Sequence, residues 1–138
     1  MIKLTTAHTI SSAPPAEFFA RWADMESWPE WNTDTEWVRL DGPFKSGSTG
    51  QLKPKGGPKV NFVIERLSAS EFVDVSKLIG ARLTFDHRIE QTPAGGSDVS
   101  VAVTLDGPLA RVWNVILGKD IKSSVQPDLD RLVAVAEA

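Results

Sequence analysis

Hydrophobic and polar residues alternate along residues 2–10, which predicts a β-strand with one covered face. The alternation divides this segment into two sets, with Ile2, Leu4, Thr6, His8 and Ile10 on one face and Lys3, Thr5, Ala7 and Thr9 on the other. We expect the first set to face the core, because it holds the larger apolar side chains.

The period changes to that of a helix after the first strand. Ser11 and Ser12 supply a possible helix cap, and Pro14 and Pro15 fit the first turn, where the missing N–H of proline has no partner in any case. The apolar residues that follow, Phe18, Phe19, Trp22 and Ala23, have helical spacing. The pattern predicts a helix that ends near Met25 and then a second short helical turn.

From Thr35 onward the period is two, which predicts a series of strands. The expected strands are 35–40, 48–54, 60–67, 71–78, 81–91 and 97–106, separated by turn residues rich in glycine and proline. Because the connections are short, neighbouring strands should pair antiparallel. One face of two of these strands is apolar: Leu83, Phe85, His87 and Ile89 in one, and Val99, Val101, Val103 and Leu105 in the next.

The chain closes with a helical segment at about residues 108–136. Its first apolar group runs from Leu109 to Leu117 and its second from Ile121 to Ala136. At about 100° per residue the two apolar stripes are rotated by roughly 150° from each other. We therefore expect a kinked helix or two consecutive helices, with the bend at Gly118 or Pro127.

Composition excludes several classes of protein but does not indicate one function. The chain has 138 residues, which suits a single domain over 1–138, and it has no cysteine for disulfides, thiol catalysis or thiolate metal sites. The net charge of −3 argues against nucleic acid as a partner, because phosphate binding needs a basic surface. No apolar run reaches 18 residues and no signal peptide is evident, so we expect no membrane span and a cytoplasmic location.

The element order predicts an α+β fold. A strongly curved antiparallel sheet of six to seven strands, wrapped round the long C-terminal helix, accommodates the two short helices after the first strand. Such a sheet often encloses a cavity, because its concave face is wider than one helix can fill.

Three stretches resemble the SRPBCC superfamily, which includes START-like domains, plant pathogenesis-related ligand carriers and bacterial polyketide cyclase/dehydrase proteins. They are residues 10–31 with the SWPEW segment, the strand 83–90, and residues 105–110 that lead into the terminal helix. The resemblance covers essentially the whole chain and implies the helix-grip fold, with a hydrophobic cavity between the sheet and the terminal helix. It does not imply one function, because the superfamily includes carriers, cyclases, co-chaperones and oxygenase domains.

His8 and His87 are the only histidines, and both fall on faces with apolar neighbours. In the superfamily arrangement one strand separates them, so their backbones would lie about 10 Å apart and both side chains could line one cavity. They are candidates for general acid/base catalysis or ligand orientation. The alternative is two partly buried histidines that bond to backbone or hydroxyl groups. A third metal ligand is lacking, so we expect neither a metal site nor a cofactor.

Aromatic and apolar side chains are the main candidates for ligand binding. Four tryptophans, Trp22, Trp28, Trp31 and Trp37, lie within 16 residues, and they either pack the helical pair against the sheet or form a rim that stacks on a flat ligand. Arg39 would need a carboxylate partner if it faced inward. The expected ligand-binding residues are Trp28, Trp31, Trp37, Arg39, Phe62, Phe85, Val101, Val103, Trp113 and Leu117.

Three functions stay open at this point. The first is a carrier or sensor-like module that binds a small hydrophobic molecule, and the second is a polyketide cyclase/dehydratase-type enzyme that uses the cavity histidines. The third is a protein-interaction module of the co-chaperone type, which would have an exposed apolar patch rather than a sealed cavity. A homodimer is compatible with each of them. The segment GPFKSGST, at residues 42–49, resembles a phosphate-binding loop but has serine at the lysine position, so we expect no nucleotide site there.

Overall fold

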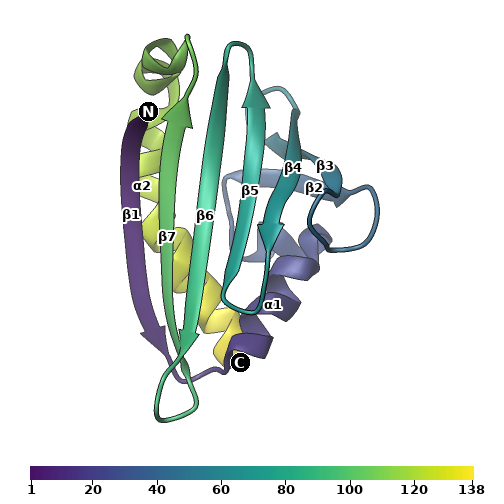
Figure 1. Ribbon diagram of the computed structural model, residues 1–138, viewed down its shortest axis with the longest axis vertical. Helices are drawn as coiled ribbons and strands as arrows, with labels where there is room; N and C mark the ends of the chain where they lie inside the picture. The colour runs from purple at the N-terminus through teal and green to yellow at the C-terminus, as the bar shows by residue number, and fades with distance from the viewer.

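A computed structural model describes all residues, 1–138, as one seven-stranded antiparallel sheet with helices on its concave face (Figure 1). The strands are β1 (Ile2–Ser11), β2 (Thr35–Leu40), β3 (Thr49–Pro54), β4 (Val60–Leu67), β5 (Glu71–Leu78), β6 (Ala81–Gln91) and β7 (Ser97–Asp106). Their order in the sheet is β1-β7-β6-β5-β4-β3-β2, so β2 to β7 form a meander and β1 joins beside β7.

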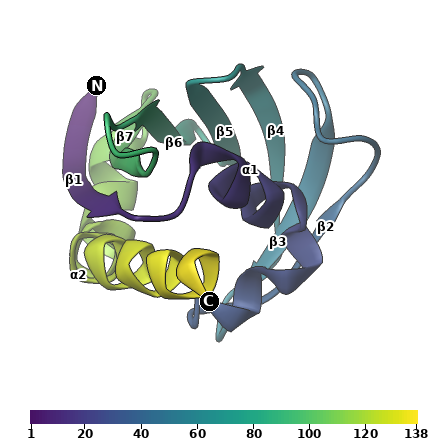
Figure 2. The ribbon, with the colours of Figure 1, turned by 90° about the horizontal axis from the view of Figure 1, so that it is seen from below.

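The helices occupy the space that the curved sheet leaves. They are α1 (Pro15–Ala23), the 3-10 helix η1 (Met25–Glu30) and α2 (Ala110–Glu137). Figure 2 shows the sheet curling from β1 to β2 around this space, with α1 and the last turns of α2 inside the curve. The predicted α+β helix-grip fold is confirmed.

The predicted strand ranges agree with the structure to within one residue. The strand ends could be predicted because the connections contain turn residues, such as glycine, that interrupt the alternation. Between β5 and β6, for example, only Ile79 and Gly80 connect Leu78 to Ala81, and Gly80 has a φ of +68° that favours glycine.

Strand β1 departs from simple alternation. Its pairing with β7 shifts register between Lys3 and Thr5, which is the signature of a β-bulge. Beyond the bulge the two faces are exchanged, so Ala7 is buried while His8 and Ile10 are exposed. The prediction that His8 faces the core is therefore wrong, because one extra residue reverses every later side chain.

Helix α2 is a single continuous helix of 28 residues that contains Pro127. Its first and last turns run in different directions in Figure 2, so the helix is bent without being broken. The second half buries a regular stripe, Val125, Leu129, Leu132 and Ala136, against the rest of the core.

Helix α2 also contacts the free edge of β1. The side-chain amide of Gln126 accepts a hydrogen bond from the backbone N–H of His8 at 3.1 Å and donates one to the carbonyl of His8 at 3.2 Å. These two backbone groups have no neighbouring strand to pair with, because β1 is the last strand of the sheet.

Candidate functional site

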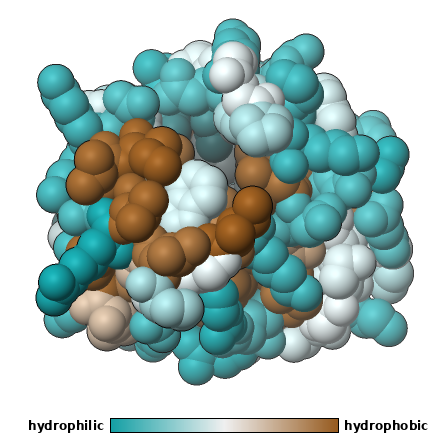
Figure 3. Space-filling model, turned by 90° about the horizontal axis from the view of Figure 1, so that it is seen from above, coloured by the Kyte–Doolittle hydropathy of each residue, from teal (hydrophilic) through white to brown (hydrophobic).

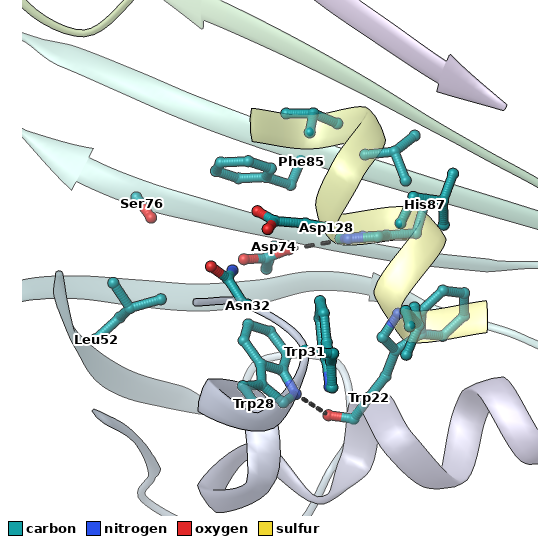
Figure 4. Close-up of a pocket in the computed structure, with 14 residues that line it drawn as sticks. Trp22, Trp28, Trp31, Asn32, Leu52, Asp74, Ser76, Phe85, His87 and Asp128 are labelled. Carbon is teal, nitrogen blue, oxygen red and sulfur yellow. Dashed lines mark hydrogen bonds and ion pairs between the residues drawn. The ribbon is translucent and has the colours of Figure 1, made fainter. Parts of the chain in front are cut away.

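A pocket lies between the sheet, the tryptophans of the α1–η1 region and the second half of α2 (Figure 4). The space available to the centres of water-sized spheres is about 90 Å³, where one water needs roughly 10–15 Å³. The lining residues are Trp22, Trp28, Trp31, Asn32, Leu52, Asp74, Ser76, Phe85, His87, Val101, Val125, Asp128, Leu129 and Leu132.

Adjacent strands place an acidic and a basic side chain together in this pocket. In the β5–β6 pairing Asp74 lies opposite Phe85, and Phe72 lies opposite His87, so Asp74 and His87 are diagonal neighbours on the inner face. The Nδ1 atom of His87 is 3.7 Å from Oδ1 of Asp74. Both side chains are about nine-tenths buried, at 11% and 9% exposure.

The hydrogen bonds of His87 define its tautomer. Nδ1 lies 2.8 Å from the carbonyl oxygen of Phe72, and because a carbonyl can only accept, Nδ1 carries the proton. The imidazole stacks on the Phe72 ring, with centroids 4.8 Å apart, and its centroid is 5.2 Å from that of the Trp22 ring. Nε2 makes no hydrogen bond within the chain and is left as an acceptor.

Burial shifts both groups toward their neutral forms. It raises the pKa of the Asp74 carboxyl to about 7, against the opposing effect of a backbone hydrogen bond. It lowers the pKa of the His87 imidazole to about 4, against the hydrogen bond to Phe72 and the charge of Asp86. Near neutral pH the pocket therefore holds a neutral histidine beside a carboxyl that is poised between its two states.

Three indole rings form the opposite wall of the pocket. Trp28 donates its Nε1–H to the carbonyl of Trp22 at 3.2 Å, and its ring centroid is 5.5 Å from that of Trp31. The Nε1 atoms of Trp22 and Trp31 are buried without a hydrogen-bond partner, and so is Oδ1 of Asp74. Buried polar atoms are rarely left unpaired, so these three atoms show that the pocket wall contains polar groups without a partner in the chain.

The remaining polar groups of the pocket are acidic or uncharged. Asp128 on α2 is bonded to Arg131 at 2.8 Å, and burial raises the pKa of its carboxyl to about 6, against the effect of that arginine. In Figure 4 Asp74, Asp128 and Asn32 extend toward the same space, between the indoles and Phe85. No lysine or arginine lines the pocket.

The structure places five of the predicted site residues in this pocket. They are His87, Trp28, Trp31, Phe85 and Val101. Phe62 and Val103 face the same interior, but they are buried in the hydrophobic core and do not line the pocket.

The other predicted site residues lie elsewhere. His8 is on the outer face of β1, where its Nε2 is 2.6 Å from Asp98. Trp37 and Arg39 flank the buried Val38 on β2 and so point away from the core, and Arg39 bonds to Asp41 and Gln51. The prediction that His8, Trp37 and Arg39 line the cavity is wrong. For His8 the reason is the bulge in β1, and on β2 the reason is that Val38 takes the inward position.

Trp113 and Leu117 were expected at the cavity but belong to the first half of α2, outside the pocket. The indole of Trp113 donates to the carbonyl of Ile79 at 2.8 Å and so ties the β5–β6 turn to the helix. This half of α2 packs against the beginning of β1 instead, where Gly118 is buried beside Leu4.

Sequence reasoning missed Asp74 and Asp128 as pocket residues, whereas Trp22 was one of the four tryptophans considered for a ligand-binding rim. A signal for Asp74 was present, because the two-residue β5–β6 turn fixes the register and the alternation then places Asp74 on the same face as His87. Asp128 gave a weaker signal, since it lies three residues after Val125 and four before Leu132 on the buried stripe.

The end of the molecule that contains the β5–β6 turn has an exposed apolar patch (Figure 3). The chain has seven exposed large hydrophobic side chains. Six of them lie at this end of the molecule, at the N-terminus, in the β5–β6 turn and around the start of α2: Met1, Ile79, Leu109, Val112, Val115 and Ile116. An interaction module was expected to have such a patch and a filled interior, whereas this structure has both the patch and a pocket. No helix of the chain is both long enough and apolar enough to span a membrane.

A curved antiparallel sheet packed against a long C-terminal helix defines the helix-grip fold. The family described as "Polyketide cyclase / dehydrase and lipid transport" matches residues 1–137, and the chain belongs to this family. No curated protein matches its sequence.

Solved structures with the same fold include proteins of different kinds. The Zhui aromatase/cyclase from Streptomyces sp. R1128 has a TM-score of 0.77 at 12% identity, over 96% of this chain and 92% of that one. Ara h 8.0201 has a TM-score of 0.71 at 18% identity, over 96% of each chain. The di-domain ARO/CYC StfQ of the steffimycin pathway has a TM-score of 0.75 at 11% identity, over 99% of this chain and 51% of that one. At these identities the likeness concerns the fold alone.

Proposed function

We propose that this protein binds a small, largely apolar molecule in the pocket between the sheet and the second half of α2. The observation that carries the proposal is the pocket itself, in which nine of the 14 lining residues are hydrophobic and a few polar groups converge. Small-molecule sites have this composition, since apolar walls supply affinity and a few polar groups set orientation.

Pocket occupancy can be tested with benzyl alcohol, a neutral aromatic probe of suitable size. Binding should change the tryptophan emission of the wild-type protein, because three tryptophans line the pocket. Val101→Phe fills the pocket from β7 and should abolish the response. Val115→Phe is the matched control, because Val115 is 86% exposed on α2 and lies outside the pocket.

Folding of each variant should be checked by circular dichroism. If Val101→Phe does not fold, Ser76→Phe offers a second way to fill the pocket from a partly exposed position on β5. A wild-type protein that gives no response, or a response that survives both pocket-filling variants, would contradict the proposal.

A second candidate function is catalysis on a polyketide-like substrate in the same pocket. The observation that favours it is the buried pair of His87 and Asp74, since Nε2 of a neutral histidine can take a proton and a protonated carboxyl can give one. Purified protein should then convert a poly-β-ketone thioester, and His87→Gln should abolish turnover while benzyl alcohol still binds within a few-fold. Equal loss of turnover and binding would mean that His87 only shapes the pocket.

A further inference from the structure

We propose that the molecule bound in this pocket carries a protonated amine beside its apolar part, and that the carboxylate of Asp74 binds this amine. The inference rests on the proposed function, and it narrows the ligand from a small apolar molecule to a small apolar amine. Three features of the pocket support it: its charge, the missing partner of Asp74, and its indole walls.

The charged groups of the pocket favour a cation over an anion. Two carboxyl groups, Asp74 and Asp128, line the space, and no lysine or arginine does. The only other titratable group of the lining is His87, which is neutral because its pKa is lowered to about 4. A ligand carboxylate would lie beside the carboxyl of Asp74 with no basic side chain of the lining to offset its charge, whereas an ammonium group would stabilise the ionised form of Asp74.

Asp74 lacks the cation that a buried carboxylate requires. Its Oδ1 atom has no hydrogen-bond partner, and the nearest basic atom, Nδ1 of His87, is 3.7 Å away and donates to Phe72 instead. Asp128 differs, because Arg131 already neutralises it. An ammonium group has three N–H donors and would supply Asp74 with the cationic partner that it lacks.

The indole rings that line the pocket also favour an ammonium group. Trp22, Trp28 and Trp31 all line the pocket, and tryptophan is the aromatic side chain that attracts cations most strongly. Aromatic walls around a carboxylate are a general solution for binding amines, since the rings replace part of the water that the cation loses. The apolar part of the ligand would then contact Val125, Leu129 and Leu132 of α2.

Three probes that share one ring separate the possibilities: benzylamine, benzyl alcohol and benzoate, which are cationic, neutral and anionic near pH 7.5. Isothermal titration calorimetry of the wild-type protein should find benzylamine bound at least about tenfold more tightly than benzyl alcohol, and benzoate bound most weakly. Asp74→Asn should remove the preference for the amine and leave the affinity for benzyl alcohol within about twofold.

Two further variants serve as comparisons. Asp128→Asn should lower benzylamine affinity by no more than about threefold, because that carboxylate already has Arg131. Asp98→Asn, on the outer face beside His8, should change none of the three affinities.

Proton release gives a readout that needs no variant. Because the pKa of Asp74 is near 7, binding of an ammonium group should ionise the carboxyl and release a fraction of a proton. The apparent enthalpy of benzylamine binding should therefore differ between phosphate and HEPES buffers at pH 7, and that of benzyl alcohol should not.

The outcomes are distinct. Equal affinities for benzylamine and benzyl alcohol would overturn the amine assignment and leave the proposed binding function intact. An amine preference that survives Asp74→Asn would overturn the role of Asp74. If none of the three probes binds at millimolar concentration, the proposed function fails and the inference fails with it.

Discussion

The chain has two histidines, each beside an aspartate, in opposite surroundings. His8 and Asp98 on the outer face are 2.6 Å apart, with side chains 58% and 46% exposed. His87 and Asp74 in the pocket are 3.7 Å apart, with side chains 11% and 9% exposed. The shorter contact is the less consequential one, because water already stabilises both members of the outer pair.

Burial moves the pKa values of Asp74 and His87 in opposite directions. Without water the charged form of each group is costly, so the carboxyl gains proton affinity and the imidazole loses it. Contact distance alone therefore does not show which pair matters for ligand binding, because a buried group has lost the water that would stabilise its charge.

The largest expected difference between the pairs is in folding stability. His87→Ala removes a ring that stacks on Phe72 and leaves the Phe72 carbonyl without its donor, so the free energy of unfolding should fall by about 3 kcal/mol. His8→Ala should cost less than about 1 kcal/mol. Urea unfolding of both variants at pH 7 measures this, and equal losses would contradict the comparison.

The next difference concerns pH. The folded pKa of Asp74 is raised to about 7 from 3.8, so its contribution to stability is complete below pH 4 and is lost as the pH rises through 7. Asparagine has no such loss. Asp74→Asn should therefore be more stable than the wild type at pH 8, by about 2 kcal/mol, and should lose this advantage at pH 4.

His87 has the opposite dependence. Its folded pKa is lowered to about 4 from 6.5, so its contribution is complete above pH 6.5 and is lost as the pH falls through 4. The two slopes offset each other in the wild type between about pH 4 and 6.5. Asp74→Asn should expose the slope of His87 as a fall in stability on acidification, and a flat profile in that variant would show that His87 is not held neutral.

The smallest effect is expected at the outer pair. Asp98→Asn should change the free energy of unfolding by less than about 1 kcal/mol. Raising the salt concentration from 0.05 M to 1 M should shrink even this difference, because counter-ions screen exposed charges. A larger effect that resists salt would show that His8 and Asp98 are coupled to the core after all.

The fold was predictable because its signals are local and repeated. Six strands in succession show clear alternation, and short turns such as Ile79–Gly80 leave antiparallel pairing as the only option. The two apolar stripes of the terminal segment correctly indicated that its halves face different surroundings. Which half of the helix lines the pocket could not be predicted, because this depends on how the helix packs against the sheet.

The site was predictable only in part. Residues on regular strands, such as Phe85, His87 and Val101, were placed correctly. His8 was misplaced because β1 contains a register shift, which alternation alone does not reveal. Alternation left open which way Trp37 and Arg39 face, and the structure turns Val38 inward between them. Asp74 could have been predicted, because an acidic residue at an inward strand position is rare and therefore informative.

The contact between Gln126 and His8 has a consequence for how this protein behaves at high concentration. An unpaired outer strand invites the strand of another molecule to add to it, and such addition can continue into fibrils. The glutamine amide occupies the N–H and C=O that an incoming strand would need at this position. The side chain of Gln126 therefore blocks strand addition at this position of β1, and in this way it limits polymerisation of the protein along that edge.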